Sequence, residues 1–171
     1  NLIVLDRPNP NSYVDGPILQ PEFKSFVGMH PVPIAHGLTV GEFATMINGE
    51  GWLEGGKKCS LEIVQLKNWT HADNYSLLVK PSPNLPNDQA VRLYPSLCLF
   101  EGTAISLGRG TPFPFLVLGN PEFKNVKGMD FQFTPIDIKG MANDPPLENQ
   151  LCYGIDLRQA PVERRVNLKY L

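Results

Sequence analysis

Short apolar runs separated by polar, proline-rich segments set the pattern of this chain. Leu2–Leu5 is a continuous apolar run that stops at Asp6, and it predicts a buried strand. Residues 60–66 alternate between apolar and polar side chains, which is typical of a second strand. The same reasoning predicts strands over residues 113–118, over 131–138 with a break at Pro135, and over 152–157.

Helical signals are fewer and more local. Thr39 is a good N-cap, and Glu42 stands three residues later, so the pair predicts a capping box. The helix would run over about residues 40–48 with Phe43, Met46 and Ile47 facing inward. This favours a structural role for Glu42 over a catalytic one. A short helix is also expected over residues 88–93, and another is expected to begin in 164–171.

Residues 11–33 are broken by prolines and are predicted to be mostly loop. We expect the apolar side chains in this segment to attach it to the core: Phe23, Phe26, Val27 and Met29. Because strands and helices intermix along the chain, the fold class is predicted as α/β, a mixed sheet with flanking helices and long Pro/Gly-rich loops.

Composition narrows the class of protein. The 171 residues include 42% hydrophobic and 19% charged side chains, which is typical of a globular chain with a core. The 17 prolines and 15 glycines indicate long ordered loops, where binding groups often lie. A net charge of -2 gives no basis for nucleic-acid binding. No apolar run is long enough for a membrane span.

No cofactor or metal is expected. The cysteines Cys59, Cys98 and Cys152 form no CxxC pair, which argues against a zinc site, and at most one disulfide is possible. Apolar neighbours make Cys98 an inert core residue. The chain also lacks GxSxG, HExxH and P-loop motifs.

The stretch from Tyr94 to Phe115 holds one acidic and one basic residue, Glu101 and Arg109, among small residues. Arg109 lies between Gly108 and Gly110 in a predicted turn. Charged groups are rarely buried unless they are paired. The two residues therefore either face a ligand or form a structural salt bridge.

Other polar positions leave similar alternatives. Asp6 and Arg7 follow the first strand, where α/β proteins place ligand sites, although a surface turn with the two side chains in solvent or paired together explains them equally well. His36 precedes the first helix, where polar ligands gather, yet a lone histidine is more often structural. The proline-stiffened loop over 80–87 is either a rigid connector or a support for sugar-binding groups.

Carboxylate chemistry is what the residues favour. Glycoside hydrolysis typically needs two carboxyl groups on either side of the scissile bond. Asp6, Glu42 and Glu101 are the carboxylates that lie beside the clearest proline, glycine or helix-start signals. Sequence gives no distance between them, so an acid/base pair and an anomeric outcome stay unassigned.

Seven motifs in order resemble one family. They are LDRPNP (5–10), GP (16–17), SFVG (25–28), PIAHGLTVGE (33–42), PSPNLP (81–86), YPxLCLFEGT (94–103) and GRGTxxPF (108–115). Together they resemble the bacterial exo-β-N-acetylmuramidases of the NamZ type, long catalogued as a domain of unknown function. The resemblance extends to about residue 157.

The resemblance implies an enzyme that releases N-acetylmuramic acid from the non-reducing ends of peptidoglycan fragments. It further implies export to the periplasm or cell exterior, a role in cell-wall turnover and recycling, and an active site between a Rossmann-like N-terminal domain and a C-terminal α/β domain. On this basis residues 1–10 are a remnant of the first domain, and 11–171 are the second, truncated at its end. The family's upstream blocks are absent, including the one expected to carry the principal catalytic Glu, and His71 stands where the family pattern has Arg.

The resemblance also implies roles for residues of this chain. Arg109, or second Arg7, would bind the lactyl carboxylate of muramic acid. Glu101 would orient Arg109, contact the sugar or assist catalysis. The other expected substrate-binding residues are Asp6, Asn9, His36, Ser82, Asn84, Thr103 and Thr111. The partners implied are a peptidoglycan-derived sugar or muropeptide and the missing N-terminal domain; the alternatives are a non-catalytic carbohydrate-binding module and a structural domain.

Overall fold

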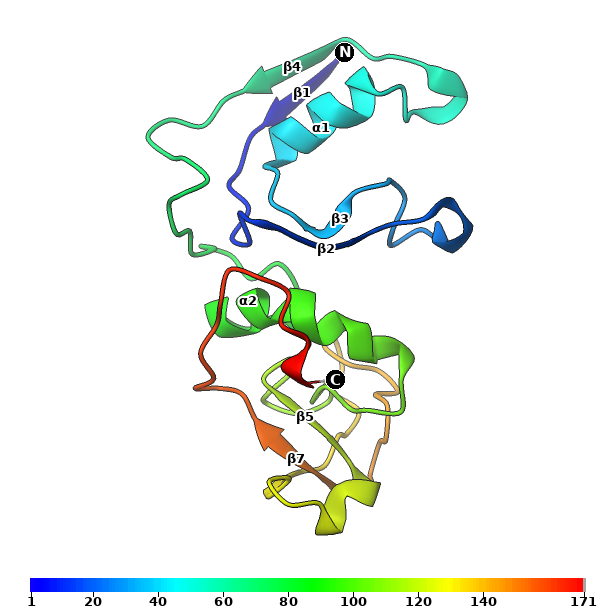
Figure 1. The fold of residues 1–171 in the computed structure, drawn as a ribbon, viewed down its shortest axis with the longest axis vertical. Coiled ribbons are helices and arrows are strands. Elements are labelled where there is room, and N and C mark those ends of the chain that lie inside the picture. The colour runs from blue at the N-terminus through cyan, green and yellow to red at the C-terminus, as the bar shows by residue number, and fades with distance from the viewer. Residues whose placement is uncertain (171) are drawn as a thin grey trace. The chain divides into compact units, whose positions relative to one another are not determined.

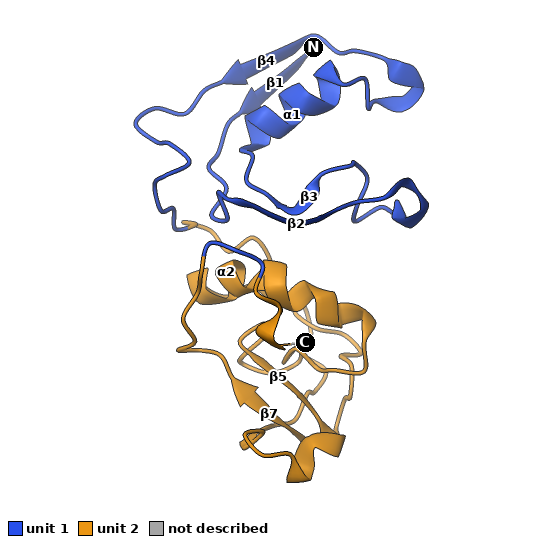
Figure 2. Cartoon of the chain, viewed as in Figure 1, with its two compact units in different colours: residues 1–76, 164–166 blue, residues 77–163, 167–171 orange. Residues whose placement is uncertain are grey.

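The computed structural model describes residues 1–170, which form two compact units (Figure 2). Unit 1 comprises residues 1–76 with 164–166, and unit 2 comprises residues 77–163 with the end of the chain from 167. The boundary predicted at residues 10 and 11 lies inside unit 1. That the first ten residues end a preceding Rossmann-like domain stays a prediction.

Unit 1 contains a small β-α-β arrangement. Strands β1 (Leu2–Leu5) and β4 (Leu61–Val64) pair in parallel, and helix α1 (Val40–Gly49) packs on both of them (Figure 1). Both strands and the helix were predicted. The prediction that β1 is buried is wrong, since Leu2, Ile3 and Leu5 are each at least half exposed. Within the described residues β1 pairs with β4 alone, so little of unit 1 covers it.

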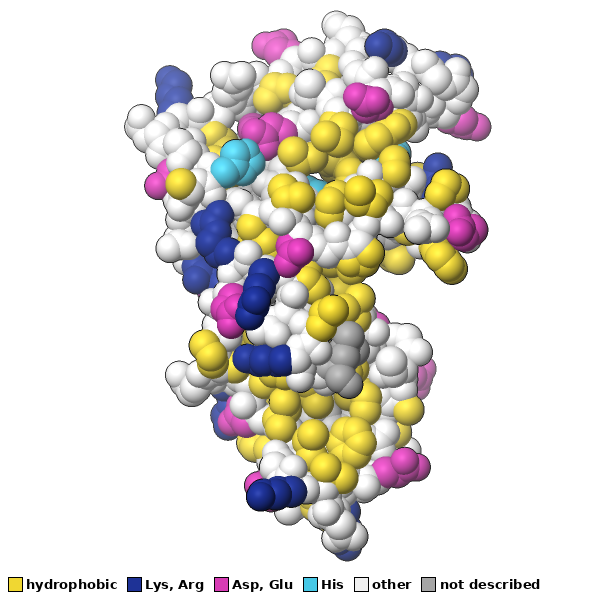
Figure 3. All heavy atoms as spheres, viewed as in Figure 1, with side chains coloured by type: hydrophobic (Ala, Val, Ile, Leu, Met, Phe, Trp, Pro, Cys, Tyr) yellow, Lys and Arg dark blue, Asp and Glu magenta, His cyan; other side chains and the backbone are white. Residues whose placement is uncertain are grey.

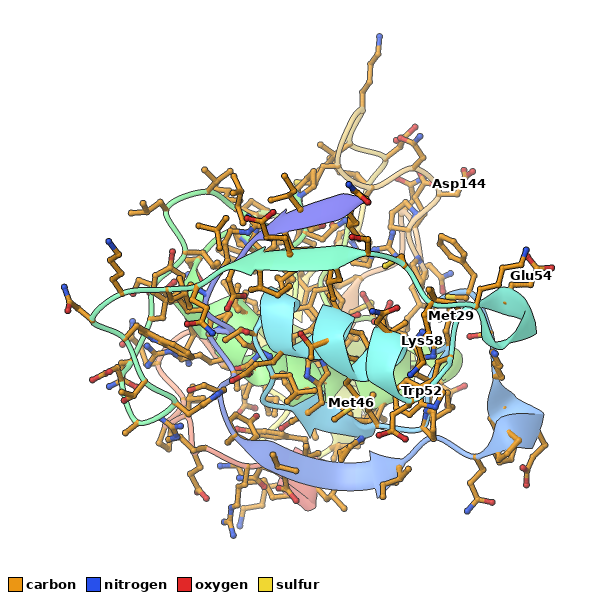
Figure 4. All side chains as sticks on the ribbon, turned by 90° about the horizontal axis from the view of Figure 1, so that it is seen from above. Met29, Met46, Trp52, Glu54, Lys58 and Asp144 are labelled. Carbon is orange, nitrogen blue, oxygen red and sulfur yellow. The ribbon has the colours of Figure 1, made fainter. Side chains whose placement is uncertain are left out.

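The start of α1 confirms the predicted capping box. The Glu42 backbone N–H donates to Thr39 Oγ1 at 3.1 Å, and the Thr39 N–H donates back to Glu42 Oε2 at 2.8 Å. At the other end, the Trp52 N–H donates to Ile47 O and Lys58 Nζ donates to Gly49 O. Figure 4 shows Trp52 and Lys58 at this C-terminal end of the helix.

Residues 11–33 are more ordered than predicted. Strand β2 (Val14–Ile18) pairs antiparallel with β3 (Pro33–His36), and a short 3-10 helix spans Pro21–Phe23. Gly16, with φ of 89°, lies at the irregularity in the pairing. The expected packing of this segment on the core is wrong, because Phe23 and Met29 are largely exposed and the turn between Ser25 and Gly28 leaves Phe26 and Val27 93% and 94% exposed.

Unit 2 holds the main hydrophobic core. Helix α2 (Asp88–Leu97) begins at the N-cap Asn87, whose side chain accepts a hydrogen bond from the Ala90 N–H, and it contributes Ala90, Leu93 and Leu97 to the core. The helix predicted over residues 88–93 was shorter. In the structure a 3-10 helix over Cys98–Gly102 continues from α2 and contains Glu101.

A three-stranded antiparallel sheet faces this core in the order β5 (Val117–Asn120), β7 (Cys152–Asp156) and β6 (Phe131–Phe133). The predicted strand over 113–118 therefore starts later, after Pro114. Of the strand predicted over 131–138, Phe131–Phe133 forms β6, so the break at Pro135 is confirmed, whereas a strand over 136–138 is wrong. Residues 168–170 form a 3-10 turn rather than part of a longer helix, and Leu171 lies outside the described residues.

The chain is a mixed α/β protein with small sheets, as its class was predicted. The single mixed sheet is wrong, since parallel and antiparallel strands of residues 1–170 lie in separate sheets of two, two and three strands. Further 3-10 turns span Glu54–Gly56 and Pro121–Asn125.

Candidate functional site

The predicted turn around Arg109 exists in unit 2 and is tightly fixed. The Gly108 carbonyl accepts hydrogen bonds from the Thr111 N–H at 3.1 Å and from Thr111 Oγ1 at 2.6 Å. Gly108 and Gly110 have φ of 73° and 79°, which glycine adopts without strain. A Cβ would lie 2.5 Å from Val117 Cγ2 at position 108 and 2.7 Å from Pro145 Cγ at position 110. The turn therefore needs both glycines and presents Arg109 in one orientation.

The side chain of Arg109 carries an unused donor. Its Nε is buried and has no hydrogen-bond partner among the described residues. A buried donor left without a partner costs about 1–3 kcal/mol. The described residues also contain no ion pair between Arg109 and Glu101, so the structural salt bridge considered from the sequence is absent. An acceptor from outside the chain would satisfy this donor.

Tyr94, on the last turns of α2, belongs to the same cluster. Burial, and then the negative charge of Glu101, raise the pKa of Tyr94 to about 12, while Arg109 acts in the opposite direction. The phenol is thus a protonated donor at neutral pH. Its ring packs edge-on against Phe115, with centroids 5.0 Å apart. Tyr94 could not be assigned a role from the sequence, because no local pattern shows that its hydroxyl meets Glu101.

Phe115 adds a strained backbone to this cluster. It is a buried, non-glycine residue with φ of 55°. Such a conformation costs about 1–3 kcal/mol and is concentrated at functional sites in proteins. Its N–H donates to the Leu107 carbonyl at 2.8 Å, which ties the strained residue to the segment just before the Arg109 turn.

The cysteines do not contribute reactive thiolates. Burial, and then Glu101, raise the pKa of Cys98 to about 11, and burial raises that of Cys152 to about 11 as well. Both thiols are therefore protonated at neutral pH. Cys59, Cys98 and Cys152 are all free of disulfides.

The remaining expected residues of unit 2 differ in what they offer a ligand. Thr111 is buried and its hydroxyl is used within the Arg109 turn. Thr103 Oγ1 donates to the Phe100 carbonyl at 2.7 Å and accepts from the Ile105 N–H.

The loop that precedes α2 carries the other two. Ser82 Oγ accepts from the Asn84 N–H at 3.2 Å. Asn84 Nδ2 donates to Met141 O at 2.8 Å, but its Oδ1 is buried and without a partner in residues 1–170. Asn84 is the member of this group with an unused polar atom.

In unit 1 the structure brings Asp6, Asn9 and His36 to the start of α1. Asp6 Oδ2 accepts from Thr39 Oγ1 at 2.9 Å and its Oδ1 accepts from the Gly41 N–H at 2.7 Å, so this carboxylate caps the helix. Asn9 Nδ2 donates to Leu38 O at 3.2 Å.

His36 Nδ1 accepts from the Leu38 N–H, and burial lowers the pKa of His36. Its ring stacks on Phe43, with centroids 5.0 Å apart. These contacts explain the expected residues of unit 1 as parts of the fold. The side chain of Arg7 is exposed, and among the described residues it has no hydrogen bond or ion pair.

Residues 1–170 contain no group of three or more His, Cys, Asp and Glu side chains placed to hold a metal ion. Within the same residues, no helix has the length and apolar character needed to cross a membrane.

The fold is that of known structures of bacterial proteins. A DUF1343 family protein from Bacteroides fragilis NCTC 9343 superposes with a TM-score of 0.91 at 51% identity, over 98% of this chain and 48% of that chain. A second DUF1343 family protein of the same organism superposes with a TM-score of 0.74 at 24% identity, over 98% of this chain and 45% of that chain, and it supports the fold alone.

Sequence comparison identifies the family. Residues 1–89 match the family model described as exo-beta-N-acetylmuramidase NamZ, N-terminal, and residues 92–169 match the model described as its C-terminal part. The chain belongs to the NamZ-type exo-β-N-acetylmuramidase family, as its motifs predicted. The peptidoglycan beta-N-acetylmuramidase NamZ of Bacillus subtilis (strain 168) is 37% identical over 91% of this chain, which spans 40% of that protein.

Proposed function

We propose that this chain is part of a glycoside hydrolase that releases N-acetylmuramic acid from the non-reducing ends of peptidoglycan fragments, and that it supplies substrate recognition. The similar Bacillus subtilis protein is named a peptidoglycan β-N-acetylmuramidase, and its likeness covers nearly all of this chain. The observation that carries the recognition role is the buried, unpartnered Nε of Arg109 on a turn that two glycines hold in place.

Muramic acid differs from glucosamine by a lactyl ether that ends in a carboxylate. A guanidinium group presents parallel N–H donors that match the two oxygens of a carboxylate. A carboxylate accepting from Arg109 Nε and one terminal nitrogen would satisfy the donor that the protein leaves unused. The fixed turn means that little side-chain or loop entropy is lost on binding, which favours recognition.

Other polar groups of unit 2 extend this proposal. The protonated phenol of Tyr94 is a donor beside Glu101, so Glu101 is held next to the proposed carboxylate site. Glu101 itself is exposed and would contact a sugar hydroxyl or assist catalysis. Asn84 Oδ1 offers an acceptor for the N–H of an acetamido group. Ser82 and Thr103 would add weaker contacts, because their hydroxyls already bond within the fold.

The proposal extends to the full-length protein, of which this chain would be one part. We propose that the principal catalytic carboxylate belongs to a preceding Rossmann-like domain and that substrate lies in a cleft which that domain shares with this chain. A periplasmic or extracellular location, with a role in cell-wall turnover and recycling, fits a peptidoglycan substrate.

The experiment replaces Arg109 in the full-length enzyme and compares two chromogenic substrates, a β-N-acetylmuraminide and the corresponding β-N-acetylglucosaminide. Arg109→Ala should lower kcat/KM on the muraminide about 10- to 100-fold, which corresponds to loss of charged hydrogen bonds worth about 1.5–3 kcal/mol. Activity on the glucosaminide, however low, should fall much less because that substrate has no lactyl carboxylate.

Arg158→Lys is the matched control, since the Arg158 guanidinium already pairs with Asp156 at 2.7 Å. It should leave the ratio between the two substrates unchanged. Equal losses on both substrates in Arg109→Ala would rule out recognition of the lactyl group.

A further inference from the structure

A histidine and a glutamate of unit 1 form a pair for which the proposed function has no use. His71 Nε2 lies 2.9 Å from Glu42 Oε1, and both side chains are nearly half exposed, at 46% and 44%. The second oxygen of Glu42 accepts from the Thr39 N–H. The pair lies near the ends of β1 and β4 and the start of α1, the edge at which open α/β sheets bind ligands.

The pairing determines what His71 presents to solvent. Burial alone would raise the pKa of Glu42, but the hydrogen bonds from His71 and from the Thr39 N–H hold it below the usual range. Glu42 is therefore an ionised acceptor at neutral pH, and the hydrogen between the two groups must sit on His71 Nε2. In a neutral imidazole this leaves the lone pair on Nδ1 as an acceptor, and the described residues provide no donor for it.

A donor lies beside this acceptor. The rings of Trp69 and His71 meet edge-on with centroids 5.1 Å apart, and Trp69 Nε1 is buried without a hydrogen-bond partner among residues 1–170. The backbone that carries both rings is held in place, because Arg164 Nη2 donates to His71 O at 2.7 Å and to Ser12 O at 2.9 Å. The unused acceptor and the unused donor thus belong to two rings in contact, on a segment whose backbone is held at His71.

We propose that His71 and Trp69 form a second sugar-binding site, in which one hydroxyl group donates to His71 Nδ1 and accepts from Trp69 Nε1. A hydroxyl is the common sugar group that both donates and accepts. Glu42 pairs with His71 directly, and Asp6 acts electrostatically on Glu42. Asp73 bonds the neighbouring Thr70, and the guanidinium of Arg164 binds the His71 carbonyl. Because carboxylates predominate, this site favours a neutral hydroxyl over the lactyl carboxylate. The inference rests on the proposed action on peptidoglycan sugars and deepens it.

The variant His71→Gln separates binding from structure. Its amide nitrogen takes the position of Nε2 and keeps the hydrogen bond to Glu42, but no acceptor remains at the position of Nδ1. Calorimetric titration of the full-length protein with N-acetylglucosamine, which has no lactyl carboxylate for Arg109, should give about threefold to tenfold weaker binding at pH 8, the equivalent of one lost hydrogen bond. Trp69→Phe, which keeps the ring and removes the N–H, should give a similar loss.

His30→Gln is the matched control, because His30 stacks on Trp52 and lies outside the pair. It should bind N-acetylglucosamine as the unmodified protein does.

Unchanged binding in His71→Gln or in Trp69→Phe would overturn the site, and so would an unmodified protein that binds no sugar. The thermal midpoint of each variant shows whether a loss reflects unfolding instead. If the full-length protein cleaves muraminides while His71→Gln binds normally, this inference alone fails. If it cleaves none while His71→Gln still weakens sugar binding, the glycosidase proposal fails and the site stands.

Discussion

The two units are stabilised in different ways. The buried apolar clusters of the described residues lie in unit 2, where Leu97 and Cys152 are completely buried. Among the described residues of unit 1, Ala35 is buried at 3% exposure, and many large apolar side chains are exposed, among them Leu5, Val14 and Phe26. Figure 3 shows hydrophobic side chains at the surface of unit 1. Unit 1 is held instead by polar contacts at the start of α1.

This difference bears on how each unit reaches stability. Burial of apolar area contributes about 25 cal/mol per Å², whereas a hydrogen bond contributes about 1 kcal/mol net. A unit that relies on helix caps and exposes its strands is expected to have a small free energy of unfolding. Large exposed apolar surfaces commonly mark contact with other protein.

The largest effect is expected in the core of unit 2. Leu97→Ala should lower the free energy of unfolding of unit 2 by about 3 kcal/mol, because the removed side chain is 0% exposed and leaves a cavity. Leu5→Ala in unit 1 should change stability by less than about 0.5 kcal/mol, since Leu5 is 71% exposed. Amide hydrogen exchange of β5 and β1 measures the two units separately. Similar losses from both substitutions would contradict the contrast between the units.

A moderate effect is expected at the start of α1. Thr39→Ala removes the side-chain bonds to the Glu42 N–H and to Asp6, which should destabilise unit 1 by about 1 kcal/mol. Both tryptophans, Trp52 and Trp69, lie in unit 1, so their fluorescence during urea unfolding reports on this unit.

Thr45→Ala is the control for that measurement. The Thr45 hydroxyl donates back to the Gly41 carbonyl within the same helix, a contact that adds little to helix stability, so its loss should be nearly neutral. If both threonine variants unfolded at the same urea concentration, the cap would not be what holds unit 1.

The smallest effect on the stability of unit 1 is expected from lowering the pH. The folded pKa of Glu42 is depressed, so its contribution is complete above the unfolded pKa of about 4.3 and is lost as pH falls through the folded pKa. Since Glu42 is 44% exposed, solvent screening limits this to a few tenths of a kcal/mol. The free energy of unfolding of unit 1, followed by tryptophan fluorescence, should therefore fall below about pH 4, and Glu42→Gln should lessen that fall. An identical acid profile in Glu42→Gln would exclude this carboxylate as the cause.

Features that depend on neighbouring residues in the chain could be predicted from the sequence. The capping box of Thr39 and Glu42, the turn of Gly108 to Thr111 and the break at Pro135 each follow from backbone preferences within a few residues. Contacts between distant residues could not be predicted. Glu42 and His71 are separated by 29 positions, and nothing local shows that they meet.

Burial was the least predictable property. The apolar run Leu2–Leu5 forms a strand because its local pattern is that of a strand, but its exposure depends on which elements lie beside it. The same holds for Phe26 and Val27, whose apolar character predicted packing while their place at a turn exposes them. For Arg109, glycine neighbours predicted the turn, whereas the unpartnered Nε depends on the tertiary surroundings.

The last segment of the chain makes the two units inseparable by a single cut. Residues 164–166 belong to unit 1, where Arg164 binds Ser12 and the Val166 N–H donates to Asp15 Oδ2 at 2.7 Å. The chain then rejoins unit 2, where the Asn167 N–H donates to Ser96 Oγ. A recombinant fragment that ends at residue 76 therefore lacks part of its own unit, and neither unit is one contiguous segment of the chain.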